Sequence, residues 1–321
     1  MSAMDFGVSQ TDLVDFAGYG VSFERADQHL RKTLGDTLAH QLAAAAVKAL
    51  VDEAELTPKP ALVDRRGRGA HRDLDLPLMR RSAHALRPGF VAMARAAHST
   101  VPDQFQSLRE TLGRIGRDTE RTMLAVTNAA NTHRGAIWVM GLLVAATAQV
   151  GNRDTYRIAA TAAEIARHRD RFVPKCVSNG ERVRQQYGVR GARGEAEDGF
   201  PHVVSIALPM LRQARRHGKC EKVARVDALL AIMASLDDTC VLHRGGTEAL
   251  ELAKRGAGAV LAAGGSGATA GMDELMALDS ALLARNASPG GAADLLAAAL
   301  FLDRIEWDDT WSIPSVNGME K

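Results

Sequence analysis

The stretch NTHRGAIWVMGLLVAATAQV, residues 131–150, joins a polar segment to one of the longest apolar runs in the chain. Asn131 or Thr132 can accept a backbone N–H as a helix cap, and Gly135 permits close packing in the first turn. The apolar run after Arg134 reaches about 15 residues, short of the roughly 20 that a membrane span needs. The stretch therefore predicts a buried helix in a protein without a membrane span.

The rest of the chain repeats this helical pattern. Apolar residues recur at three- and four-residue steps, alanine and leucine are abundant, and aromatic residues make up only 4%. No convincing alternating strand pattern occurs between these segments, so we predict an all-α fold. The expected helices cover residues 40–51, 72–97, 104–126, 134–150, 153–170, 201–217, 220–236, 246–262, 270–285 and 289–304.

The connections between these segments concentrate glycine, proline and charge, and no long Ser/Gly linker separates them. We therefore predict a single compact multi-helix domain whose site is a cleft lined by helix termini and glycine-rich connections. We expect residues 1–29 to be an N-terminal extension or a part of the same domain, residues 30–306 to be the helical domain that carries the site, and residues 307–321 to be a C-terminal tail.

Bulk charge and cysteine usage exclude several classes of protein. A net charge of +2 is too small for nonspecific nucleic-acid binding. Cys176, Cys220 and Cys240 are odd in number and lack CxxC spacing, so neither a disulfide framework nor a zinc site is indicated. With no signal-peptide pattern at the N-terminus, a cytoplasmic location is expected.

Two basic or glycine-rich connections are candidates for binding a compact anion. Residues 59–72 hold a basic run interrupted by glycines, which suits a phosphate clamp, although such a run is also typical of a solvated surface: Lys59, Arg65, Arg66, Arg68, His71 and Arg72. Residues 288–291 place a capping serine and a proline before two glycines, so free N–H groups could bind phosphate there. An ordinary helix start without a ligand is the equal alternative.

Two acidic segments are candidates for catalysis or for metal binding. Glu195, Glu197 and Asp198 follow Arg193 closely, and their mutual repulsion can be relieved by solvent, by the arginine or by a divalent cation. Asp73 and Asp75 are either first-turn acids favoured by the helix dipole or ligands of a hard cation that arrives with phosphates.

Five segments in order resemble one family. They are KPALVDRRGRGAHRDLD (59–75), NTHRGAIWVMGLL (131–143), GARGEAEDGFP (191–201), DDTCVLHRGG (237–246) and SPGGAADLLA (288–297). Together they resemble the triphosphoribosyl-dephospho-CoA synthases, the ATP:dephospho-CoA triphosphoribosyltransferases. The departures are small: the family pattern has glycine near Ala61, lysine as often as arginine at Arg72 and Arg134, and serine near Ala292.

The resemblance implies attack of the 2'-hydroxyl of 3'-dephospho-CoA on C1' of ATP, with loss of adenine through an oxocarbenium-like transition state. A triphosphate needs cationic clamps and Mg²⁺, and the two substrates need a general base and a proton donor. The residues assigned on this basis are Glu195, Glu197 and His133 as catalytic groups; Lys59, Arg65, His71, Arg72, Asn131, Arg134, Arg193, Arg244, Ser288, Gly290 and Gly291 as substrate-binding groups; and Asp73, Asp75 and Asp238 as metal ligands.

The resemblance also implies a pathway. We expect the product to serve malonate decarboxylase rather than citrate lyase, because the chain ends soon after SPGGAADLLA without a fused second enzyme. A separate holo-carrier-protein synthase would then use the product, and the enzyme could be a homodimer. The alternatives are a non-catalytic helical protein that binds ATP or CoA, and a helical scaffold for a decarboxylase complex.

Overall fold

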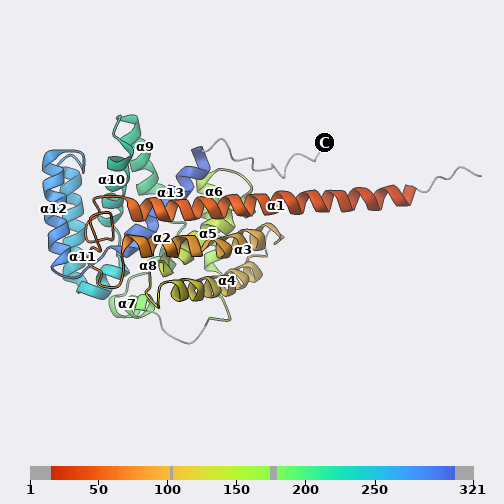
Figure 1. The fold of residues 1–321 in the computed structure, drawn as a ribbon, viewed down its shortest axis with the longest axis horizontal. Helices are drawn as coiled ribbons and strands as arrows, with labels where there is room; N and C mark the ends of the chain where they lie inside the picture. The colour runs from red at the N-terminus through yellow and green to blue at the C-terminus, as the bar shows by residue number, and fades with distance from the viewer. Residues whose placement is uncertain (1–15, 102–103, 174–178, 308–321) are drawn as a thin grey trace, which may run out of the picture.

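The computed structural model describes residues 16–101, 104–173 and 179–307. Helices make up the regular structure of these residues, which contain no strand beyond one isolated bridge between Asp64 and Gly67, so the all-α prediction is confirmed. Figure 1 shows the arrangement. The elements are α1 (Phe16–Glu55), α2 (Leu76–Ala85), α3 (Arg87–His98), α4 (Phe105–Val126), α5 (Arg134–Val150), α6 (Thr155–Arg167), α7 (Asn179–Tyr187), α8 (Gly191–Glu197), η1 (His202–Ala207), α9 (Leu208–Arg216), α10 (Glu221–Met233), α11 (Thr239–Ala262), α12 (Thr269–Leu283) and α13 (Gly290–Trp307).

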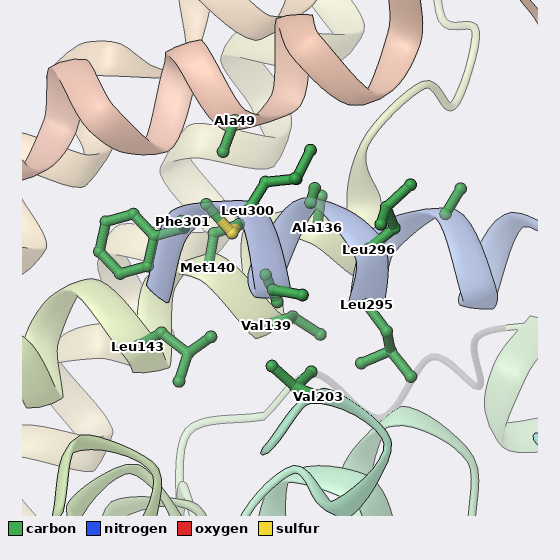
Figure 2. Packing of buried hydrophobic residues seen from close by; sticks show 14 of the residues in the cluster. Ala49, Ala136, Val139, Met140, Leu143, Val203, Leu295, Leu296, Leu300 and Phe301 are labelled. Carbon is green, nitrogen blue, oxygen red and sulfur yellow. The ribbon is translucent and has the colours of Figure 1, made fainter. Parts of the chain in front are cut away.

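Helices α5 and α13 form the centre of the core. Both are apolar around most of their circumference, because neighbouring helices surround them. In Figure 2, Leu300 and Phe301 of α13 pack with Met140 of α5, below Ala49 of α1. The small residues of α5 allow this close packing. The central position of the 131–150 stretch agrees with its prediction as a buried helix.

Some predicted boundaries differ from the observed ones. The segment expected at 72–97 is two helices, because Arg87–Pro88 starts α3 and proline cannot continue a preceding helix. Helix α1 begins at Phe16, well before the helix expected at 40–51, and its N-terminal part extends beyond the other helices in Figure 1. The predicted tail lies, apart from residue 307, outside the described residues.

Two further differences affect the region of the site. Residues 191–197, expected as a connection, form the short helix α8. Helix α11 begins at Thr239, not at 246, and contains a kink at Gly246, whose φ of 65° and ψ of −163° are not helical. Gly246 therefore separates a short first segment, which carries Arg244, from the long helix expected after it.

By length and composition, no single helix within the described residues could cross a membrane. Only α5 and α6 pass such a test together, as a pair bent by 114°. Most of their residues belong to the core of the domain.

Candidate active site

A cavity of about 570 Å³ lies where several helix ends meet. Its walls come from α1, from the connection after α1, and from the first turns of α5, α11 and α13. Small-molecule sites usually measure roughly 300–1,000 Å³, so this cavity has the size of a ligand site. The sequence-predicted residues that line it are Lys59, His71, Asp73, Asn131, His133, Arg134, Arg244, Ser288, Gly290 and Gly291.

The connection after α1 is fixed by Arg66, a member of the basic run 59–72 that was not assigned to the substrate. Arg66 donates to Asp64 and to the carbonyl of Lys59, and its Nη1 lies 3.0 Å from Oδ2 of Asp279 in α12. Ala61, where the resemblance led us to expect glycine, has a φ of 53°, a left-handed conformation that glycine adopts without strain. The connection therefore presents its side chains to the cavity from a fixed backbone.

The rim of the cavity is cationic. Arg134 begins α5, is 42% exposed and forms an ion pair with Glu120. Arg244 lies just before the kink of α11, and its Nη1 donates to the carbonyl of Ala70 at 2.9 Å. His243 and Arg244 are both exposed at this opening. Because these groups are exposed, they can bind an anionic ligand without complete desolvation.

Three side chains beside the rim form a hydrogen-bonded chain. Arg244 Nη2 lies 3.0 Å from His71 Nδ1, and His71 Nε2 lies 2.9 Å from Ser288 Oγ. Arginine can only donate, so Nδ1 accepts and the ring proton resides on Nε2. Burial, and then the charge of Arg244, lower the pKa of His71 to about 4. His71 is therefore neutral at pH 7, and the Ser288 hydroxyl, which accepts from it, can donate its own proton to a ligand.

His133 lies deeper in the cavity. It is only 3% exposed, and its Nδ1 is 2.9 Å from Ser82 Oγ, which also bonds to Thr132. Burial, and then the charge of Lys59, lower the pKa of His133 to about 4. Its Nε2 is buried and has no hydrogen-bond partner in the described residues. His133 can thus offer a neutral hydrogen bond to a ligand, but it cannot act as a cationic clamp at pH 7.

The floor of the cavity contains two carboxylates that the sequence analysis missed, Glu53 of α1 and Asp294 of α13. Lys59, only 1% exposed, donates to Glu53 Oε1 at 2.5 Å and to the Glu53 carbonyl at 2.6 Å. Lys59, predicted as a phosphate clamp, is therefore already paired. In the sequence, the position of Lys59 shortly after α1 was the signal that could have pointed to a buried partner on that helix.

Asp294 lies against the first turn of α5. A Cβ atom on Gly135 would come within 2.0 Å of Asp294 Oδ2, so a side chain at position 135 would force the Asp294 carboxylate to move. Burial raises the pKa of Asp294 well above its ordinary value of 3.8, and Glu53 and Asp238 raise it further. The available signal was the short spacing within one segment: Asp294 follows Ser288 by less than two helical turns.

The first turn of α13 differs from its prediction. Asp238 accepts hydrogen bonds from the N–H groups of Cys240, Val241, Gly291 and Ala292, and so links the starts of α11 and α13. The N–H groups of residues 290 and 293 bond to the carbonyls of residues 288 and 289. The expectation of free N–H groups for phosphate is therefore wrong. Asp238 serves as a cap, and its assignment as a metal ligand gains no support.

Several other predicted residues lie outside the large cavity. Glu195 is buried and accepts from the His202 N–H at 2.9 Å and from His202 Nδ1 at 2.7 Å, beside an adjoining cavity of only about 30 Å³. Arg193 pairs with Glu197 at 2.7 Å. The remaining three are Arg65, paired with Glu55; the exposed Arg72; and Asp75, which caps α2 through the Leu78 N–H. Their functional roles stay predictions.

The N-cap residue of α5 is His133, which makes no capping hydrogen bond with its side chain, and one of the two predicted residues accepts the first backbone N–H of the helix instead. Asn131 Oδ1 accepts from the Arg134 N–H at 3.2 Å, whereas Thr132 bonds to Ser82. Thr132 therefore holds the Ser82–His133 arrangement rather than the helix end. The polar stretch before α5 both starts the helix and positions a ring in the cavity.

Comparison with known proteins identifies the family of the chain. The chain is 59% identical over 272 residues to a probable 2-(5''-triphosphoribosyl)-3'-dephosphocoenzyme-A synthase of Azotobacter vinelandii, covering 84% of this chain and 93% of the relative. It is 52% identical over 265 residues to the 2-(5''-triphosphoribosyl)-3'-dephosphocoenzyme-A synthase of Klebsiella pneumoniae, covering 82% and 94%. No solved structure matches the chain. The sequence model of one family covers residues 39–312, and the chain belongs to that family, the ATP:dephospho-CoA triphosphoribosyl transferases.

Proposed function

We propose that the protein transfers the triphosphoribosyl group of ATP to the 2'-hydroxyl of 3'-dephospho-CoA and releases adenine. The observation that carries this proposal is the division of one cavity into a cationic rim and a carboxylate floor. A triphosphate needs positive charge, whereas a ribosyl centre that gains positive charge in the transition state needs carboxylates. The two ends of the cavity meet these needs separately.

The rim would bind the triphosphate. Arg134 and Arg244 supply positive charge, and Ser288 supplies a hydroxyl donor oriented by His71. The ribose then extends toward His133 and the floor. In this arrangement water is displaced from the buried end, which protects C1' from hydrolysis.

We also propose that Mg²⁺ enters with the triphosphate. Mg²⁺ that arrives with a nucleotide is held mainly by phosphates and by one or two carboxylates of the protein. Asp73 fits this role, because it lines the cavity, is 62% exposed and lies no closer than 4.0 Å to His71 Nδ1. The ion would neutralise phosphate charge.

For the product we propose the carrier protein of malonate decarboxylase as the destination, after transfer by a separate holo-carrier-protein synthase in the cytoplasm. The test is deletion of the gene in its host. Loss of malonate decarboxylase activity with normal citrate lyase activity is expected, and the reverse pattern would assign the enzyme to citrate lyase.

Purified protein incubated with ATP, Mg²⁺ and 3'-dephospho-CoA should release free adenine in equal amount to the new nucleotide product, as measured by chromatography and mass spectrometry. Formation of ADP instead of adenine would refute the proposed reaction. Binding of ATP without turnover would favour the alternative of a non-catalytic nucleotide-binding protein.

A further inference from the structure

Asp294 is exceptional among the buried and partly buried carboxylates of the described residues. Glu53 is paired with Lys59, Glu195 with His202, and Asp238 with four backbone N–H groups. Asp294 forms no hydrogen bond and no ion pair with any described residue, although it lines the large cavity. A carboxyl group in such a place usually costs stability, which a structural role alone would not explain.

A second group independently indicates a ligand in the same cavity. His133 Nε2 is buried, lines the cavity and has no partner, while Nδ1 of the same ring is held by Ser82. Buried polar atoms are normally hydrogen-bonded. His133 Nε2 therefore indicates a polar atom of a ligand at the depth of the floor, where Asp294 and Glu53 lie.

We propose that Asp294 donates a proton to the departing adenine and that Glu53, paired with Lys59, receives the proton of the attacking hydroxyl. This inference rests on the proposed function and extends it by naming the two acids. Two carboxyl groups in different environments can take opposite roles in glycosyl transfer. Here one has no neutralising partner, and the other has a buried lysine.

The step balances without a further reactant. The C1'–N9 bond of ATP breaks, its electron pair stays on adenine, and the carboxyl proton of Asp294 moves to a ring nitrogen of adenine. The 2'-oxygen of dephospho-CoA bonds to C1', and its proton passes to the Glu53 carboxylate. Proton exchange through solvent after product release restores both groups.

The environment of Asp294 fits a proton donor. Burial, Glu53 and Asp238 all raise its pKa, so Asp294 holds its proton to a higher pH in the folded protein than in the unfolded chain. The folded state then binds more protons than the unfolded state, and the stability contributed by Asp294 is lost as the pH rises through the raised pKa. Asparagine, which cannot ionise, avoids this loss.

The test is Asp294→Asn in the full chain, with Asp303→Asn as a matched control on the same helix. Asp294→Asn should lower kcat for ATP by about 10²–10⁴-fold, the usual contribution of general acid catalysis. The Kd for ATP, measured by calorimetry, should change less than about threefold, well below the effect of losing a charge-assisted hydrogen bond. Asp303 pairs with Arg215 outside the cavity, so Asp303→Asn should reduce stability and leave kcat unchanged.

The leaving group provides the decisive measurement. The base of N7-methyl-ATP leaves as an uncharged molecule without a proton, so Asp294→Asn should process it within about tenfold of the unsubstituted protein, since the general-acid contribution is bypassed. A double variant, Glu53→Gln with Lys59→Met, removes both partners of the buried pair. This double variant should lower kcat for ATP and for N7-methyl-ATP alike. Glu53 accepts the proton of the attacking hydroxyl, and that step is the same for both nucleotides.

Thermal unfolding separates this role from a structural one. Relative to the unsubstituted protein, Asp294→Asn should gain stability as the pH rises, and the difference should vanish below about pH 4, near the ordinary pKa of aspartate. Lower stability of Asp294→Asn at every pH, or an equal loss of kcat with both nucleotides, would overturn the proposal. Absence of adenine release by the unsubstituted protein would instead overturn the proposed function.

Discussion

Two pairs of carboxylates in this molecule, Glu195 with Glu197 on α8 and Glu53 with Asp294 on the cavity floor, differ in how their charge is compensated. On α8 each carboxylate has a cationic or imidazole partner: Glu195 has His202, and Glu197 has Arg193. On the floor Glu53 alone has such a partner, and Asp294 has none in the described residues. Neighbouring carboxylates in the sequence of α8 are thus compensated by nearby basic side chains. A single carboxylate without such a partner is the better indication of a ligand-binding site.

The largest expected effect is a loss of stability on removal of Lys59, the lysine that pairs with Glu53 on the cavity floor. Lys59→Met leaves the buried Glu53 carboxylate without its partner and should lower the free energy of unfolding by about 3–5 kcal/mol, measured by urea denaturation. The double variant with Glu53→Gln should recover most of this loss, because no charge is then left unpaired. A loss below 1 kcal/mol in the single variant would mean that water already compensates Glu53.

Gly135→Ala should displace the Asp294 carboxylate and lower kcat, with little change in the stability of the fold. The added Cβ would lie 2.0 Å from Asp294 Oδ2, so the carboxylate must move away from the first turn of α5. A displacement of about 1 Å can lower kcat by about 100-fold. Stability should change little, because alanine is a better helix former than glycine. Unchanged kcat for adenine release would show that the position of Asp294 is unimportant.

Glu195→Gln tests the other side of the comparison. The amide can still accept the His202 N–H, but the hydrogen bonds to a carboxylate become weaker bonds to a neutral amide, so the free energy of unfolding should fall by about 1–3 kcal/mol. We expect kcat to stay within a few-fold, since Glu195 faces only the small cavity. A large loss of kcat with an unchanged melting temperature would mean that Glu195 on α8 is the general base, as the sequence suggested.

The contrast between the pairs also explains what the sequence could predict. Helix α5 was expected at its observed residues, because a cap, a glycine and an apolar run all lie within one local segment. Glu53 and Asp294 come from opposite ends of the chain, and only the packing of α1 against α13 brings them into one cavity. Helix α8 was missed because Gly191 and Gly194 lower its helix propensity, and tertiary packing offsets that cost.

The smallest expected effect is at the rim, where solvent screens charge. Arg134→Gln removes a half-exposed cation that already pairs with Glu120, so its loss should cost about 1 kcal/mol of ATP binding. This corresponds to about a fivefold rise in KM for ATP, with kcat unchanged because the rim contacts the triphosphate in the ground state and the transition state alike. Arg121→Gln on the exposed face of α4, paired with Asp118, is the matched control and should leave KM unchanged. A fall in kcat at constant KM would instead mean that Arg134 acts on the reacting ribose, and the separation of a binding rim from a catalytic floor would no longer hold.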